Sequence, residues 1–416
     1  MKRLNPVSAF LFAAIIFLTS CTTGSGYYGQ RPAERSPDML SQEQAGPALP
    51  DKMAASGSLR PVKVGILLPL SGKHAQLGQS MLKAAQMALF DAGFEGFELI
   101  PRDTKASPMD AASAAHSAIT DGAEIILGPV FAEDVAAVRP IAQQANLNVI
   151  AFTTDWKQAG GNTYTMGFLP FDQIDRVIKY AALHNARRIG VISPTSDYGQ
   201  VAESAYQKTA ARAGIQTTEI EHFSPQTREM ADTLRRFSHF EQRQSASLPL
   251  PYDAVFMPVG GDKAKTIANM LSQLGLPPSQ VRRLGTGLLD DPSLTHEPGL
   301  ENALFAAPSP NARGSFERRF LQSYGYNAPR LSTLAYDATA LVAVLARQGL
   351  ESPANQPGFN KSALMNPNGF AGIDGIFRFR PDGTSERGLA VLEIRRGTIA
   401  VVEEAPKTFQ QPPATQ

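Results

Sequence analysis

The sequence predicts an α/β protein in which parallel sheets are built from successive βαβ units. Short apolar runs alternate with segments of helical periodicity, at about 25–35 residues per unit. The alternation starts again near residue 170, which divides the body into two halves. Of the 416 residues, 43% are hydrophobic and 19% are charged, so there is enough apolar surface for a large core and global disorder is excluded.

The first half of the body begins with the apolar run Val62–Leu68, which Pro69 closes as expected of a buried strand. A helix is predicted from about Ala75 to Asp91, because its apolar residues recur at helical spacing and Gly93 can end it. The same two patterns predict strands over 97–101, 124–127 and 148–152, with helices over 110–120 and after Gly128-Pro129.

The second half repeats the alternation and then changes character at its end. Strands are predicted over 188–193, 217–223, 254–257, 282–285 and 303–306, and helices over 174–181, 201–209, 228–240, 267–274, 316–321 and 334–345. The last strands, over 373–379, 389–395 and 399–402, are predicted to form one antiparallel meander, with Pro381-Asp382-Gly383 as a turn.

The N-terminus has the pattern of a secretory signal. Lys2 and Arg3 precede an apolar run over 9–18, which as a helix spans roughly 15 Å and is too short to cross a bilayer. The run ends in Leu18-Thr19-Ser20-Cys21, which resembles the lipobox of bacterial lipoproteins, and the chain has no other cysteine. That resemblance implies a lipid on Cys21 and, with Thr22 after it, an anchor in the outer rather than the inner membrane; an ordinary signal peptide is the alternative.

Four regions follow from these patterns. They are a signal peptide over 1–21, a Gly- and Pro-rich flexible tether over 22–60, a folded domain over 61–404 and a disordered tail over 405–416.

Composition and motifs argue against an enzyme, so we expect no cofactor and no metal. The 39 basic and 38 acidic residues give no general attraction to nucleic acid. A single cysteine and six scattered histidines form no metal-ligand pattern. The segment Gly72-Lys73-His74 lacks the spacing and the hydroxyl of a phosphate-binding loop.

A binding site is expected where parallel strands end and helices begin, because ligands of α/β sheets lie beyond the carboxyl ends of the strands. Several turns at these ends carry hydroxyl, aromatic or carboxylate side chains. The candidate cleft residues are Ser71, Phe131, Thr153, Thr154, Asp155, Tyr198, Asp262 and Asp290.

Five motifs stand out along the body: Val64 to Gly72, Leu127-Gly128-Pro129, Asp197-Tyr198-Gly199, Tyr336-Asp337-Ala338 and Gly372 to Phe379. Taken together they resemble type I periplasmic binding proteins, the Leu/Ile/Val-binding family. The resemblance covers about 62–402 and implies two Rossmann-like lobes that close on a ligand about a hinge. It places lobe 1 at about 62–168 and 306–367 and lobe 2 at about 170–304 and 369–402, with crossings near Leu169, Phe305 and Asn368.

The family's amino-acid contacts match this sequence only in part. Tyr198 holds the place of the second-lobe tyrosine, and Thr153 or Thr154 lies in the loop that binds the ligand carboxylate. Ala132 and Gly287 stand where amino-acid binders carry a hydroxyl and an acid. A buried ammonium would be poorly compensated without those partners, which argues against an amino-acid ligand.

Four further segments form a second pattern: Leu68 to Gly72, Gly128 to Phe131, Ile150 to Asp155 and Met166 to Pro170. They are similar to lipoproteins called penicillin-binding protein activators. This resemblance implies a non-catalytic regulator that contacts a peptidoglycan synthase, and it is the interpretation the sequence favours. The alternative is the substrate-binding protein of an ABC transporter, with an amino acid or a related small solute as ligand.

Overall fold

The computed structural model describes residues 61–224 and 229–410. The predicted signal peptide, the tether and Cys21 lie outside the described residues. Within those two ranges, no helix combines the length and the hydropathy that a membrane span needs.

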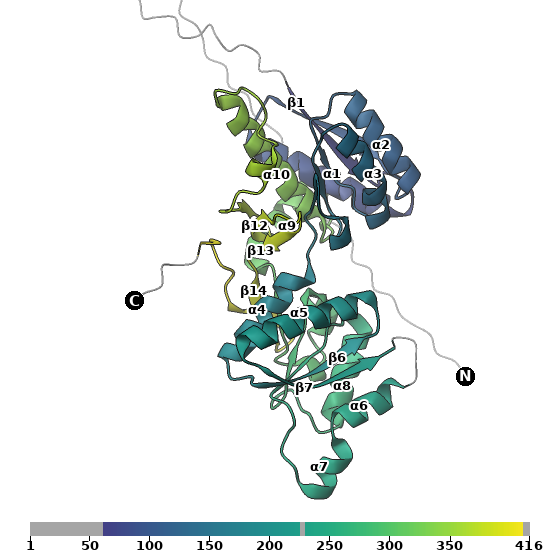
Figure 1. Cartoon of the computed structure of the whole chain (residues 1–416), viewed down its shortest axis with the longest axis vertical. Helices are drawn as coiled ribbons and strands as arrows, with labels where there is room; N and C mark the ends of the chain where they lie inside the picture. The colour runs from purple at the N-terminus through teal and green to yellow at the C-terminus, as the bar shows by residue number, and fades with distance from the viewer. Residues whose placement is uncertain (1–60, 225–228, 411–416) are drawn as a thin grey trace, which may run out of the picture. The chain divides into compact units, whose positions relative to one another are not determined.

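The first sheet has five parallel strands in the order β2-β1-β3-β4-β5. Figure 1 labels its strand β1 in the upper part of the view. Its three middle strands are apolar and almost wholly buried, because helices cover both faces of the sheet. The strands are β1 (Val62–Leu68), β2 (Phe97–Asp103), β3 (Ile125–Leu127), β4 (Val149–Ala151) and β5 (Thr163–Thr165).

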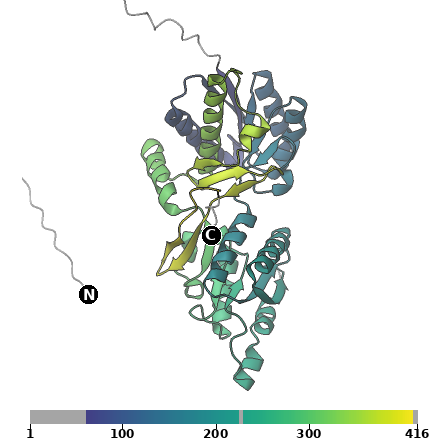
Figure 2. The same cartoon turned by 60° about the vertical axis from the view of Figure 1, so that its left-hand side comes forward.

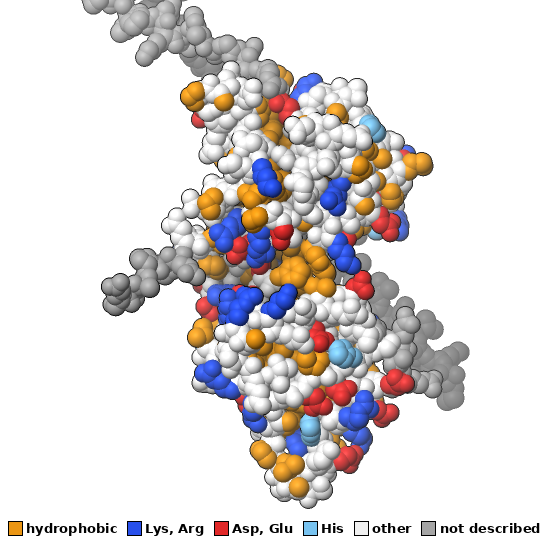
Figure 3. Space-filling model, viewed as in Figure 1, with side chains coloured by type: hydrophobic (Ala, Val, Ile, Leu, Met, Phe, Trp, Pro, Cys, Tyr) orange, Lys and Arg blue, Asp and Glu red, His pale blue; other side chains and the backbone are white. Residues whose placement is uncertain are grey.

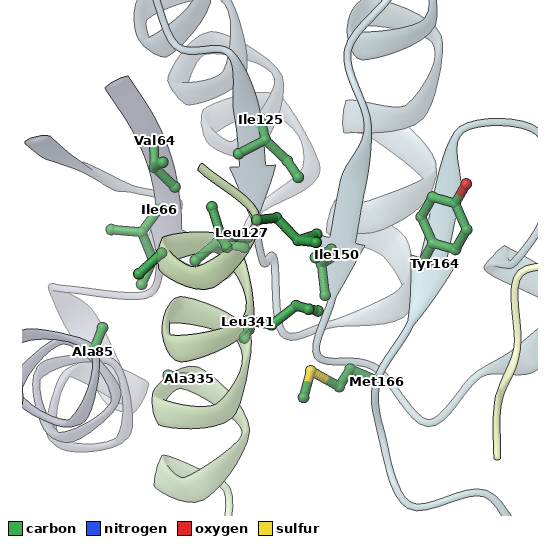
Figure 4. Close-up of a cluster of buried hydrophobic side chains, with 14 of the residues drawn as sticks. Val64, Ile66, Ala85, Ile125, Leu127, Ile150, Tyr164, Met166, Ala335 and Leu341 are labelled. Carbon is green, nitrogen blue, oxygen red and sulfur yellow. The ribbon is translucent and has the colours of Figure 1, made fainter. Parts of the chain in front are cut away.

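Two helices pack on each face of the first sheet. On one face lie α1 (Ala75–Ala92) and α10 (Ser332–Glu351), and on the other α2 (Pro108–Thr120) and α3 (Ala132–Gln144). Although α10 comes late in the chain, it fills the core of the first sheet. Figure 4 shows its Ala335 and Leu341 beside strand residues such as Ile66 and Leu127.

The second sheet has seven strands in the order β15-β14-β10-β9-β8-β6-β7. The five strands from β10 to β7 are parallel, whereas β14 and β15 run antiparallel at one edge. The strands are β6 (Arg188–Pro194), β7 (Gln216–Phe223), β8 (Ala254–Phe256), β9 (Arg282–Leu284), β10 (Leu304–Ala307), β14 (Ala390–Arg395) and β15 (Thr398–Glu403).

Helices again cover both faces. On one face lie α4 (Pro170–Leu183) and α5 (Asp197–Ala213), and on the other α6 (Met230–Phe237) and α8 (Gly261–Gln273). The short α7 (Phe240–Ala246) follows α6. One parallel sheet and one mostly parallel sheet, each covered by helices on both faces, confirm the predicted α/β class.

The predicted C-terminal meander divides between two sheets. Strands β11 (Phe370–Gly372), β12 (Gly375–Phe379) and β13 (Ser385–Arg387) form a small antiparallel sheet of their own, and β14 with β15 joins the second sheet (Figure 2). Phe377 and Phe379 are buried in the core of the first sheet, where Phe379 meets Tyr164 at 5.1 Å between ring centroids. Residues 370–387 therefore pack with the first sheet, in contrast to the predicted return to lobe 2 at 369.

We use "first lobe" for the first sheet, its helices and β11–β13, and "second lobe" for the second sheet and its helices. The chain crosses between β5 and α4, between β10 and α9 (Pro310–Tyr324), and between β13 and β14. The first two crossings lie close to the predicted Leu169 and Phe305. The third lies between β13 and β14, later than the predicted Asn368, because the aromatic residues of β12 keep this segment on the first lobe.

The described part of the predicted disordered tail makes specific contacts. The Phe409 ring lies 4.5 Å from the Arg378 guanidinium, and Gln410 Nε2 donates to Asn368 Oδ1 at 2.9 Å. Phe409 and Gln410 therefore contact β12 and the segment after α11 (Lys361–Leu364).

Candidate functional site

A hollow of about 410 Å³ is lined by residues of both lobes. The first lobe contributes Thr154, Trp156 and Arg330; the second lobe contributes Gln173, Tyr198, Gly287, Leu288 and Asp290; Phe168, Pro170, Ala307 and Pro308 lie at or beside the first two crossings. A neighbouring hollow shares Thr154 and Trp156 and adds Phe131, Thr153, Asp155 and Asp197, among others. We call the two together the interlobe cleft. In Figure 3, hydrophobic side chains gather beside α5, with Lys and Arg side chains around them.

The first-lobe wall is set by hydrogen bonds in the loop after β4. Thr153 Oγ1 accepts from the Asp155 amide at 3.1 Å, and Asp155 Oδ1 accepts from the Lys157 amide at 3.0 Å. Asp155 thereby caps a short 3-10 turn, Trp156–Gln158. This turn fixes the backbone of Trp156, whose ring meets Phe171 edge-on at 5.3 Å.

The second-lobe wall is set by the start of α5 and the turn after β9. Ser196 caps α5 by accepting from the Gly199 amide, and the Tyr198 hydroxyl lies 2.9 Å from Thr286 Oγ1. Burial raises the pKa of Tyr198, so its hydroxyl stays protonated and can donate to a ligand. Gln173 Oε1 accepts from the Gly287 amide at 2.7 Å and joins α4 to the same wall.

Arg330 lies at the wall of the first hollow in a fixed position. Its guanidinium stacks 4.2 Å from the Phe168 ring centroid. Arg330 Nη2 lies 3.0 Å from Asp374 Oδ1, and Nη1 donates to Thr333 Oγ1 at 3.0 Å. Asp374 is fully buried, so the ion pair holds Arg330 in place against the first lobe.

Two more buried ionisable residues, Arg387 and Asp337, lie close to this ion pair. The Arg387 guanidinium lies 4.9 Å from the Phe168 ring centroid and donates through Nη2 to the Met166 carbonyl at 2.8 Å. Asp337 is 2% exposed and accepts from the Ile373 amide at 2.7 Å. Burial and the nearby Asp374 raise the pKa of Asp337, which favours its neutral form.

Asp290 is the only carboxylate among the residues that line the first hollow. Its Oδ2 accepts from Arg313 Nη1 at 3.3 Å, and both side chains are mostly buried. The negative charge of Asp290 is therefore already compensated within the second lobe.

The predicted site residues divide into three groups. Thr154, Tyr198 and Asp290 line the first hollow, and Phe131, Thr153 and Asp155 line the neighbouring one. Ser71 and Asp262 line neither hollow. The Ser71 hydroxyl donates to Asp103 Oδ2 at 2.6 Å, and the Asp262 side chain is 99% exposed, 3.7 Å from Lys265 Nζ.

Sequence reasoning missed Trp156, Phe168, Gln173, Leu288 and Arg330. One signal was present for Trp156, which directly follows the predicted loop and is the only tryptophan of the chain. Arg330 gave no such signal, because it precedes a late helix and lies in the second stretch of the first lobe, after the second crossing.

Another hollow, of about 440 Å³, lies outside the cleft among α4, α5, β13 and the turns on either side of β13. Its carboxylates already pair with cations: Asp172 with Arg380 at 2.6 Å, Asp175 with Lys179 at 2.6 Å, and Glu386 with Arg378 at 2.8 Å. Among residues 61–224 and 229–410, no group of His, Cys, Asp and Glu side chains is arranged to hold a metal ion.

Comparisons with known proteins agree with this geometry. The model of a family described as "Periplasmic binding protein" matches residues 61–398. No curated protein shows significant sequence similarity to the chain.

Solved structures share the fold at low identity. A putative branched-chain amino acid ABC transporter protein from Rhodospirillum rubrum has a TM-score of 0.71 and 19% identity, covering 82% of this chain and 100% of its own. An ABC transporter substrate-binding protein from Desulfitobacterium hafniense in complex with Leu has a TM-score of 0.60 and 16% identity, covering 82% and 100%. A solute-binding protein from Rhodopseudomonas palustris in complex with 3,4-dihydroxybenzoic acid has a TM-score of 0.56 and 18% identity, covering 83% and 96%. At these identities the likeness shows the two-lobed type I fold and no more.

Proposed function

The chain belongs to the periplasmic binding protein family, and from that premise we propose that it is a non-catalytic protein that captures a small organic solute in the interlobe cleft. The observation that carries this proposal is the first hollow itself. Its volume of about 410 Å³ lies in the range of small-molecule sites, and its walls combine aromatic surface with a few fixed polar groups. Residues of both lobes meet there, so a bound solute would favour closure of the lobes.

Delivery to an ABC transporter is the role we propose for the captured solute. The structures compared above carry the names of ABC transporter and solute-binding proteins. They give no support to the peptidoglycan-synthase regulator that the sequence favoured. We therefore prefer the alternative reading of the sequence, transport of a small solute.

We further propose a lipid anchor at Cys21, on the basis of the lipobox-like segment and the tether-like composition of 22–60. The full chain should fractionate with membranes after processing. The variant Cys21→Ser should be soluble or remain unprocessed. Normal membrane fractionation of a mature Cys21→Ser protein would contradict the anchor.

A thermal-shift screen tests solute capture. The protein is unfolded and refolded to remove bound ligand, then melted with amino acids, carboxylic acids, short peptides and peptidoglycan fragments. A solute at 100 times its dissociation constant should stabilise the protein by about 2.7 kcal/mol, which is worth several degrees. If no compound shifts the melting temperature, solute capture is refuted, and a pull-down with penicillin-binding proteins becomes the next experiment.

Substitutions in the cleft then test whether the solute binds there. Tyr198→Ala and Thr154→Ala should each weaken binding of the solute found in the screen by about 1–3 kcal/mol, because each removes a hydroxyl from the wall. Tyr180→Ala is the matched control, since Tyr180 stacks on His184 and lines neither hollow of the cleft. Unchanged affinity in both cleft variants would show that the solute binds elsewhere.

A further inference from the structure

The positive charge at the first hollow comes from one side chain. Among the described residues that line it, Arg330 is the only cation. Its hydrogen bonds to Thr333 Oγ1 and Asp374 Oδ2 use two of the five N–H groups that a guanidinium offers, and its Nη2 also lies 3.0 Å from Asp374 Oδ1. The remaining donors leave capacity for a ligand, and the stack on Phe168 keeps the group from turning away.

The charges behind Arg330 favour an anion in the hollow. Arg330 and Arg387 both stack on Phe168, and the buried carboxylates nearest to them are Asp374 and Asp337. The pKa of Asp337 is raised by burial and by Asp374, which favours a neutral Asp337. Two guanidiniums therefore lie against Phe168, and the raised pKa of Asp337 lowers the negative charge that faces them.

The acids of the cleft are already occupied. Asp290 pairs with Arg313. In the neighbouring hollow, the oxygens of Asp155 accept from the Lys157 amide and from Gln158 Nε2, and Asp197 lies 3.6 Å from Lys157 Nζ. An ammonium group in the first hollow would meet only Asp290, which already pairs with Arg313, so its loss of hydration would not be offset.

The rest of the first hollow suits an apolar body. Trp156, Phe168, Leu288 and Pro308 present aromatic and aliphatic surface on several sides. A flat ring or a branched alkyl group can stack on such walls and bury its apolar area.

We infer that the solute is an apolar or aromatic monocarboxylate without an ammonium group, and that Arg330 binds its carboxylate. This inference rests on the solute-binding function proposed above and narrows it to one chemical class.

Calorimetric titration of the refolded wild-type protein with matched pairs tests the class. 3-Phenylpropanoate is compared with phenylalanine, and 4-methylpentanoate with leucine, because the members of each pair differ only in the ammonium group. 3-Phenylpropan-1-ol lacks the carboxylate. In at least one pair the acid should bind about 10-fold tighter, or more, than the amino acid, and the acid should exceed the alcohol by a similar factor.

Variants test the role of Arg330. Arg330→Gln should weaken binding of the preferred acid by about 10-fold to 100-fold, and Arg330→Lys, which keeps the charge, by less. Arg347→Gln is the matched control, because Arg347 also lies over an aromatic ring, that of Phe94, outside the cleft, and should leave the affinity unchanged. Since Arg330→Gln removes the partner of the buried Asp374, the ligand pairs in the wild-type protein stand as a separate test.

The outcomes separate this inference from the proposed function. Tighter binding of either amino acid than of its acid overturns the inference and leaves solute capture standing. The same holds if neither acid binds but the thermal screen finds a solute of another class. If the screen finds no solute at all, both the inferred chemical class and the proposed solute capture are refuted. If Arg330→Gln and the wild-type protein bind the preferred acid with equal affinity, Arg330 does not bind its carboxylate.

Discussion

Asp134 is a buried carboxylate in the first turn of α3. Its side chain is 1% exposed, and among the described residues no cation pairs with it. Burial, with a smaller contribution from Glu133, raises the pKa of Asp134 to about 6. The charged form is therefore disfavoured in the folded protein compared with the unfolded chain, where the pKa is near 3.8.

The pH dependence of this residue has a definite sign. Between the unfolded and the folded pKa the native state holds a proton that the unfolded state has lost, so stability falls as the pH rises from about 4 to about 6. Asp134→Asn has no charge to bury. At pH 8 it should be more stable than wild type by about 1–2 kcal/mol, and near pH 4 the two should differ little.

Thermal melts of both proteins across this pH range check the prediction. Glu133→Gln is the control on the same turn, because Glu133 is exposed and its removal should change the melting temperature much less. A difference between Asp134→Asn and wild type that stays constant from pH 4 to pH 8 would contradict the account.

Residue type alone did not separate cleft residues from structural ones. Ser71 and Thr154 both follow strands of the first sheet and both carry hydroxyls. Asp103, at the end of the neighbouring β2, accepts hydrogen bonds from the Ser71 hydroxyl and the Leu70 amide. Ser71 therefore stabilises the turn after β1. Among the residues that the structure describes, no side chain holds the Thr154 hydroxyl in this way, and Thr154 lines both hollows. Whether a hydroxyl is held in a turn or faces the cleft depends on which strand is adjacent in the sheet. The sequence does not give that strand order.

At the scale of elements, buried strands and amphipathic helices were predictable because their patterns depend on local burial. The C-terminal strands were predicted correctly as strands but assigned to one sheet. The alternation of side chains between the two faces of a strand is the same whether the strands form one sheet or two. The assignment depends on Phe377 and Phe379 finding space against α10 and β5, which is a contact between distant segments.

The turn from β6 to α5 depends on Gly199. A Cβ atom at this position would lie 1.9 Å from the Pro194 carbonyl oxygen, a distance at which the backbone must move. Gly199→Ala should therefore lower the melting temperature by several degrees. It should also weaken solute binding, because Tyr198 is the preceding residue and its hydroxyl position is set by this turn.

Gly314→Ala is the matched substitution in α9. A Cβ atom there meets only Arg318 Nη1, at 3.4 Å, and the residue lies inside a helix. Alanine should raise stability by about 0.5–1 kcal/mol, because glycine is the poorer helix former. If both variants change the melting temperature in the same direction by similar amounts, close packing at Gly199 is not the cause.

At the scale of the whole molecule, the cleft joins three separate stretches of chain. The turns after β4, β6 and β9 were predictable as a site, because the carboxyl ends of parallel strands gather at one edge of a sheet. Phe168 and Arg330 could not be predicted in this way. The first lies at a crossing and the second before α10, and only the packing of β12 and α10 on the first sheet brings Arg330 to Phe168.

The single tryptophan allows the central claim, that a small solute binds between the lobes, to be tested directly. Trp156 lines both hollows of the cleft, so all tryptophan emission of the protein comes from this site. Titration with a solute that stabilises the protein should change the emission of Trp156 in a saturable way, with the dissociation constant found by calorimetry. A solute that binds to saturation and leaves the emission of Trp156 unchanged would contradict the account.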